Sequence, residues 1–281
     1  MDNGIFTPRN GKSNFAASCG VQEIKQRFNF CTESQSFLVS DPFLRNQKRI
    51  PNELSPLLCE LCGVHIGDGH LGFREKKHEY LIQCTGNLKT DRDYYDIHLK
   101  RIWKELFNVD LKLKERKDNT YELRVYSKEI ALFFNQKLGM PFGKKAKIIA
   151  IPKIIKDTCK GVISNEMKSC IRGIIDTDFY LVLDRKWIEL GAWFASEQLV
   201  VDLHHYLTLF GIAPKIRLNL QYYNTSSQKY LVRHQIRIRR KDDIQRWFEE
   251  IGTNNPKIYK RYLKFRLLCS GGVDNSTTSV H

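Results

Sequence analysis

Two aspartates, Asp68 and Asp178, each close a run of apolar and small residues, and they lie 110 residues apart. The runs read Leu61-Cys-Gly-Val-His-Ile-Gly-Asp-Gly69 and Ile171-Arg-Gly-Ile-Ile-Asp-Thr-Asp-Phe179. If both runs are buried helices packed together, each carboxylate faces a like charge and the negative end of a helix dipole. Mg²⁺ would offset both unfavourable interactions, because it accepts one or two carboxylates together with phosphate oxygens. The pair therefore suits metal-assisted hydrolysis of a phosphodiester.

Glycines within the two runs indicate close packing. Gly63 and Gly67 in the first run and Gly173 in the second each lower helix propensity by about 1 kcal/mol. That loss is understandable where missing side chains let two helix backbones approach each other. We therefore expect the three glycines at a helix interface that places the aspartates side by side. The alternative is that both acids are solvated residues at helix ends.

A second pair of features repeats at nearly the same spacing. A strand pattern ends at Lys128 and is followed by an amphipathic stretch at 129–139, and the same order recurs around Lys241, 113 residues later. Two features at one period favour an internal duplication. Lys128 and Lys241 are candidates to neutralise the scissile phosphate or polarise the attacking water. Ordinary phosphate contact or surface charge is the equally weighted alternative.

The periodicity predicts an α+β protein of tandem αββαββα repeats with antiparallel sheets. In the first repeat we expect helices at 55–67 and 91–107 and strands at 80–85, 109–116 and 121–126. In the second we expect helices at 167–177 and 197–210 and strands at 179–184, 215–221 and 231–239. The predicted organisation is an N-terminal extension (1–54), a first repeat with a basic linker (55–160), a second repeat (161–268) and a polar tail (269–281). The linker carries Lys144, Lys145, Lys147, Lys153 and Lys156.

Basic and amide side chains alternate with apolar ones along the predicted hairpins, as the sheet face of a protein that reads DNA bases would require. A solvated face of mixed charge is the alternative. The chain has 46 Lys and Arg against 31 Asp and Glu, a net charge of +15 that suits a polyanionic partner. The candidate DNA-binding residues are Lys112, Lys114, Arg116, Arg124, Lys215, Arg217, Asn219, Gln221, Arg233, Gln235, Arg237 and Arg239.

Other classes of protein are disfavoured. No apolar run approaches the roughly 18 residues of a membrane span, and the N-terminus lacks the apolar core of a secretory signal. We therefore expect a cytoplasmic protein, with an organelle as the alternative, and eight reduced cysteines. The single Cys59-Glu-Leu-Cys62 pair is expected to be core packing, because no second pair lies at zinc-binding spacing.

The two runs, the strand order between them and residues 249–257 resemble the LAGLIDADG homing endonucleases, in the monomeric two-motif form of archaeal introns and inteins. The resemblance covers residues 55–268. It implies a DNA-binding saddle of sheets with the helix pair at a pseudo-two-fold axis. It also implies a monomer that cuts opposite strands of double-stranded DNA with Mg²⁺ at Asp68 and Asp178, leaving 3′ overhangs. The carbonyls of Gly67 and Thr177 would assist the metal, and Asp176 (Ile66 in the first copy) would be structural.

Two departures from the family pattern bear on activity. Phe179 replaces the glycine that closes the first copy, Gly69, and phenylalanine is a poor occupant of a left-handed helix cap. Gly86-Asn87 occupies a region where relatives carry polar water-organising residues. The predicted function is an intron-type homing endonuclease. The alternative is a non-cleaving binder, either a maturase of intron RNA or a DNA-binding regulator. The start at Met1 and the end at Ser279-Val-His281 favour a free-standing enzyme over an intein.

Overall fold

The computed structural model describes residues 48–184 and 187–270, with side chains as far as residue 267. Most of the expected N-terminal extension (1–54) and of the polar tail (269–281) therefore lies outside the described residues. Within the described ranges, none of the helices combines the length and the apolar character that crossing a membrane requires.

The first repeat follows the predicted order of elements. A four-stranded antiparallel sheet has the strand order β1-β2-β4-β3. The middle helix begins earlier than expected and contains a π-helical segment, η3, while the strand expected at 109–116 is shorter. The elements are α2 (Pro56–Gly67), β1 (Gly69–Arg74), β2 (Glu79–Asn87), α3 (Leu88–Asp93), η3 (Tyr94–Leu99), α4 (Lys100–Phe107), β3 (Leu113–Glu115), β4 (Thr120–Tyr126) and α5 (Lys128–Gln136).

The second repeat has the same topology, with strand order β5-β6-β8-β7 and every pairing antiparallel. The prediction of an α+β fold with two antiparallel sheets is confirmed. A short helix, α6 (Lys153–Lys156), lies in the linker, and α10 is a helix that the repeat pattern did not predict. The remaining elements are α7 (Asn165–Asp178), β5 (Tyr180–Leu183), β6 (Ile188–Phe194), α8 (Glu197–Leu209), β7 (Lys215–Asn224), β8 (Lys229–Ile238), α9 (Lys241–Glu250) and α10 (Pro256–Ser270).

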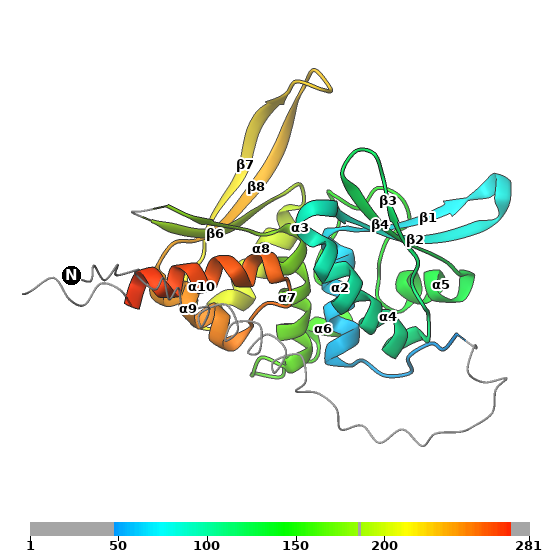
Figure 1. Cartoon of the computed structure of the whole chain (residues 1–281), viewed down its shortest axis with the longest axis horizontal. Helices are drawn as coiled ribbons and strands as arrows, with labels where there is room; N and C mark the ends of the chain where they lie inside the picture. Colours follow the sequence, from blue (N-terminus) through cyan, green and yellow to red (C-terminus); the bar gives the residue numbers. More distant parts are fainter. Residues whose placement is uncertain (1–47, 185–186, 271–281) are drawn as a thin grey trace, which may run out of the picture. The chain divides into compact units, whose positions relative to one another are not determined.

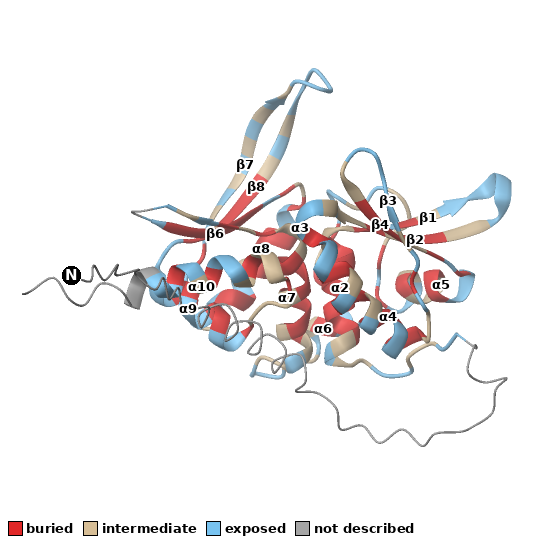
Figure 2. Cartoon of the chain, in the orientation of Figure 1, coloured by how far each residue is buried: buried red, intermediate tan, exposed pale blue. Residues whose placement is uncertain are grey.

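Helices α2 and α7, one from each repeat, pack against each other. The two sheets lie next to each other on one side of this helix pair (Figure 1). The hydroxyl of Ser55 caps α2 by accepting a hydrogen bond from the backbone N–H of Leu58, and Ser164 caps α7 in the same way through Met167. Buried residues follow both helices and the sheet faces that cover them (Figure 2). The core therefore surrounds the two helices that carry the aspartates.

The two motif helices end differently from the expectation. Neither uses a left-handed cap: Asp68 has φ −80°, Phe179 has φ −85°, and Gly69 is not among the glycines with positive φ. Gly69 is needed for space instead, because a Cβ there would lie 2.3 Å from Nδ1 of His65. Phe179 enters the strand in an extended conformation and is buried. Phe179 therefore does not have to adopt the left-handed conformation that is unfavourable for phenylalanine.

Candidate active site

Helices α2 and α7 touch at their backbones. A Cβ on Gly63 would lie 2.0 Å from the carbonyl oxygen of Cys170, and one on Gly173 would lie 2.2 Å from that of Glu60. A Cβ on Gly67 would lie 2.1 Å from Oγ1 of Thr177. All three distances are shorter than any ordinary carbon–oxygen contact. The structure therefore places the three glycines at the helix interface, where only glycine permits this approach.

The helix pair brings Asp68 and Asp178 together. Asp68 directly follows α2, Asp178 is the last residue of α7, and a Cβ on Gly67 would lie 2.9 Å from Oδ2 of Asp178. Burial, and next the charge of Asp178, raise the pKa of Asp68 well above its usual range. Burial raises the pKa of Asp178 to about 6, although Lys145 opposes this shift. The two carboxylates are thus held where burial outweighs the compensation of their negative charges by nearby lysines.

Lys145, from the linker between the repeats, lowers the pKa of both carboxylates by its charge. Its ammonium group donates hydrogen bonds to the carbonyl oxygen of Ile66 and, at 2.6 Å, to that of Gly67. Burial lowers the pKa of Lys145, while the charges of Asp178 and Asp68 act in the opposite direction. Sequence analysis did not distinguish Lys145 from the other linker lysines, and no local pattern could have done so.

The expectation for Lys128 and Lys241 needs correction. Both are exposed first residues of helices, α5 and α9, and these helices lie at the outer ends of the two repeats (Figure 1). The cations that shift the pKa of Asp68 are instead Lys145 and Lys257. Lys257 donates to Oδ1 of Asp91 at 2.7 Å. The junction of strand and helix is a surface position, whereas the site lies at the ends of the central helices.

The donor set fits a hard divalent cation better than zinc. In the described part of the chain, three or more His, Cys, Asp or Glu side chains nowhere gather closely enough to hold a metal ion. Mg²⁺ does not require such a cage, because it keeps several waters and takes further ligands from phosphate. The carbonyl of Gly67 already accepts a hydrogen bond from Lys145, so we expect the metal ligands from the protein to be mainly Asp68 and Asp178.

Asp176, the earlier acid of the second motif, ties α7 to the loop before α10. Its carboxylate accepts hydrogen bonds from the hydroxyl of Thr253 and, at 2.9 Å, from the backbone N–H of Asn254. Burial raises its pKa to about 7. Ile66, at the matching position of the first motif, is an apolar core residue with 2% exposure. These contacts agree with a structural role for Asp176.

A β-bulge changes which residues of β7 share the polar face of the second sheet, defined here as the face of Arg233, Gln235 and Arg237. Lys215 and Arg217 pair with residues of this face, but the register then shifts. Asn219 has φ 56°, and its backbone N–H donates to Nδ1 of the buried His234 at 3.2 Å.

The shift reverses the orientation of the distal residues of β7 relative to the prediction. Beyond the bulge, Leu220 pairs with Arg233 and Tyr222 pairs with Leu231, so these residues join the polar face. Gln221 pairs with Val232 and lies on the opposite face. The prediction that Lys215, Arg217, Asn219 and Gln221 share one face is therefore wrong for Gln221, because strict alternation fails at a bulge.

Aromatic side chains hold Arg233 on the polar face. Its guanidinium lies 3.9 Å from the centre of the Trp193 ring and 4.5 Å from that of Tyr222. Such contacts fix an arginine and leave the edge of its guanidinium for hydrogen bonding. Arg239 follows the end of β8 and is paired with Glu189.

In the first sheet a buried acid organises the polar side chains. Glu122 in β4 is 1% exposed and accepts from Nε2 of Gln83 at 2.5 Å. It also pairs with Arg124 at 2.8 Å and with Arg116 at 3.4 Å. Lys114 pairs with Glu122 across the β3–β4 ladder and, like Lys112 just before β3, is exposed. The two sheets therefore present different chemistry at corresponding places.

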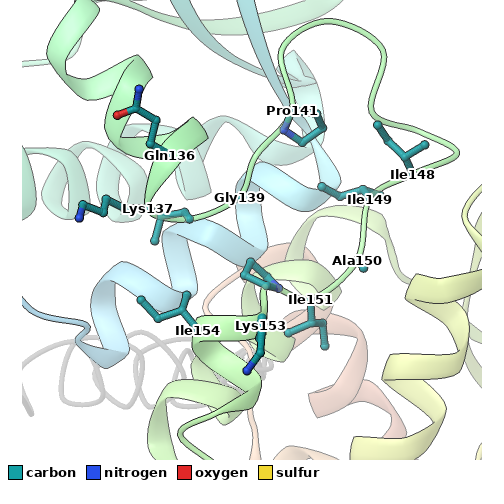
Figure 3. A pocket seen from close by; sticks show the side chains of 12 residues that line it. Gln136, Lys137, Gly139, Pro141, Ile148, Ile149, Ala150, Ile151, Lys153 and Ile154 are labelled. Carbon is teal, nitrogen blue, oxygen red and sulfur yellow. The ribbon is translucent and has the colours of Figure 1, made fainter.

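A separate pocket of about 400 Å³ lies along the linker (Figure 3). Ile148, Ile149, Ile151 and Ile154 line it together with residues 136–139. None of its lining residues is Asp, Glu, His or Cys, so it offers no ligands for a hard metal ion. The aspartate pair remains the candidate active site.

Comparisons with known proteins show what the second repeat and the longer matched segments are similar to. A family model described as a LAGLIDADG-like domain matches residues 165–252, the second repeat. The Replication factor C small subunit of Methanocaldococcus jannaschii is 31% identical over 74% of this chain and 10% of that protein. The glutamine–fructose-6-phosphate aminotransferase of the same organism is 24% identical over 59% of this chain and 14% of that protein. The chain thus spans only about a tenth to a seventh of these curated relatives.

One solved structure shares the fold across both repeats, and a second is similar to a lesser degree. A crystal structure of I-DmoI in complex with DNA and Ca has 20% identity and a TM-score of 0.51, covering 75% of this chain and 98% of that chain. Mesophilic variants of the homing endonuclease I-DmoI have 22% identity and a TM-score of 0.49, covering 71% and 96%. Residues 165–252 therefore match a LAGLIDADG-like domain, and the two repeats together have the fold of I-DmoI.

Proposed function

We propose that this protein is a site-specific endonuclease that cuts both strands of DNA with Mg²⁺ and leaves staggered 3′ overhangs. The observation that supports this most strongly is the pair Asp68 and Asp178 at the touching ends of α2 and α7. Two acids with raised pKa values, near Lys145 and Lys257 but without a cage of further ligands, suit a cation that arrives together with phosphate.

Each part of the site has a distinct task in this proposal. Asp68 and Asp178 would hold Mg²⁺, which activates water and stabilises charge on the phosphodiester when it is bound. Lys145, which contacts the carbonyl of Gly67, would neutralise phosphate charge, and Lys257, which contacts Asp91, would do the same. Each aspartate serves the cut of one strand, as the duplicated arrangement suggests.

The two sheets are proposed to lie in the major groove on either side of the cut. Arginine side chains such as Arg217, which is exposed, and Arg237 match guanine edges, whereas the predicted DNA-binding residue Gln235 is buried, with 6% exposure, and is not proposed to read a base. The two sheets carry different side chains. Glu122, Gln83 and Arg124 interact on the first sheet, whereas Trp193 and Arg233 lie together on the polar face of the second. We therefore propose a monomer with internal pseudo-two-fold symmetry that recognises an asymmetric double-stranded target.

The curated relatives support an origin of this chain as a mobile genetic element. The matched segment is a small part of two proteins from one organism whose names describe different activities. A segment shared by a replication factor and an aminotransferase is not expected to carry either activity. We propose that the shared segment is an inserted endonuclease, and that this chain promotes the homing of its own intron or intein.

The test is cleavage of DNA that spans the uninterrupted insertion site, beside the same locus carrying the insertion. With Mg²⁺ we expect staggered cuts in the uninterrupted DNA alone, lost in Asp68→Asn and in Asp178→Asn while DNA binding persists. Tight binding by the natural protein without any cut would refute the endonuclease proposal. It would favour the non-cleaving binder, and intron RNA would then be tested as its ligand.

A further inference from the structure

One buried hydroxyl lies against the carboxylate pair and has no part in the mechanism above. Tyr95, in η3, has 0% exposure, and its hydroxyl donates to Oδ2 of Asp68 at 3.4 Å. Within the described part of the chain, Asp68 is the only hydrogen-bond partner of this hydroxyl. A buried tyrosine hydroxyl normally requires such a partner. Tyr95 is thus tied to one of the two candidate metal ligands.

Two independent local features bring Tyr95 to this position. The first is the π-helical segment Tyr94–Leu99, since a π turn rotates the residues after it relative to a regular α-helix and is frequent at functional sites. The second is Gly86 in β2. A Cβ on Gly86 would lie 2.7 Å from Cε2 of Tyr95 and 3.1 Å from its hydroxyl oxygen. Strand β2 therefore offers no side chain here, and the Tyr95 ring fills the space.

The second repeat has no counterpart to this contact. Its middle helix, α8, is an uninterrupted α-helix of 13 residues. Among the residues that the structure describes, no side chain donates a hydrogen bond to Asp178. The charge of Lys145 lowers the pKa of Asp178. The charge of Lys145 acts on both acids, so they differ in one contact: a hydroxyl donates to Asp68, whereas no described side chain donates to Asp178.

We propose that Tyr95 is a positioning residue that fixes the Asp68 carboxylate for metal binding, so that only one of the two strand cuts depends on Tyr95. This inference rests on the proposed function, in which each aspartate serves one strand. Groups that orient a metal ligand typically change metal affinity or activity by 10–100-fold when they are removed. Because the hydrogen bond is long, we expect the lower end, about tenfold.

The experiment compares Tyr95→Phe with Tyr94→Phe in the full chain. Tyr94 is the matched control, because it is an adjacent buried tyrosine of η3 whose hydroxyl has no hydrogen-bond partner among the described residues. A duplex target with a different fluorophore on each strand reports the two single-turnover rates. Tyr95→Phe should slow one strand about tenfold, leave the other within about twofold and accumulate the nicked duplex. Tyr94→Phe should change neither rate.

Gly86→Ala provides a second variant, because the added methyl group displaces the Tyr95 ring without removing its hydroxyl. It should reproduce the one-strand defect. Equal slowing of both strands, or no slowing of either, in Tyr95→Phe would overturn the inference. If the natural protein cuts neither strand, the proposed function itself fails, and this outcome is distinct from symmetric slowing.

A readout without cleavage completes the test. Electron paramagnetic resonance measures Mn²⁺ bound to the protein–DNA complex during a titration. In Tyr95→Phe, one class of bound Mn²⁺ should weaken about tenfold while the remaining binding stays unchanged. Identical Mn²⁺ titrations for the natural protein and Tyr95→Phe would overturn the positioning role.

Discussion

Replacing Gly173 by alanine tests the helix contact on which the whole site depends. The new Cβ would lie 2.2 Å from the carbonyl oxygen of Glu60 and 2.8 Å from the backbone nitrogen of Val64. Ordinary van der Waals contact needs about 3.4 Å, so α2 and α7 must separate by about 1 Å. Overpacking of this kind destabilises by up to about 3 kcal/mol, and alanine regains about 1 kcal/mol of helix propensity. We expect a net loss of about 2 kcal/mol in the free energy of unfolding.

The same separation moves Asp68 away from Asp178, and a displacement of about 1 Å can slow catalysis about 100-fold. Urea unfolding and single-turnover cleavage measure the two effects. Gly72→Ala is the control, because its Cβ would meet the flexible end of His70 at 3.1 Å and Cβ of Leu81 at an ordinary 3.9 Å. Its stability should change by less than about 0.5 kcal/mol. If Gly173→Ala is as stable and as active as the natural protein, the two helices do not touch as described.

Three further predictions follow from individual contacts. Lys145→Met should abolish cleavage but retain DNA binding, whereas Lys144→Met, at the exposed neighbour, should retain both; a gel-shift assay beside a cleavage assay separates the two activities. Glu60→Gln should cost about 3 kcal/mol at pH 7, because it breaks a buried ion pair with Arg172. Burial raises the pKa of Glu60, but His98 and Arg172 lower it from 4.5 to about 2. The contribution of Glu60 to the free energy of unfolding is therefore complete above pH 4.5 and fades as the pH falls toward 2. Urea unfolding at different pH values should show this loss of stability in the natural protein and not in Glu60→Gln. Arg233→Ala should weaken binding by roughly 1–3 kcal/mol and relax base preference at one position, measured by fluorescence anisotropy on single-base variants of the target.

Local sequence patterns determined the fold class and the position of the two acids in the chain. Long runs that are mostly apolar favour buried helices, and glycines inside them predict a close approach of backbones, as at Gly63 and Gly173. Alternation of polar and apolar residues predicted the hairpins, because successive side chains of a strand point to opposite faces. These signals lie within a few residues of each other, so each could be interpreted without the rest of the chain.

Features that depend on the meeting of distant segments were decided only by the tertiary structure. Lys145 looks like its linker neighbours until the chain brings it onto the carbonyl of Gly67, 78 residues earlier. The bulge at Asn219 depends on a hydrogen bond to His234 in the next strand, and it moved Gln221 to the other face. Tyr95 reaches Asp68 only through a π turn and the space left at Gly86. Sequence periodicity assumes regular helices and strands, so it cannot register the places where long-range contacts make them irregular.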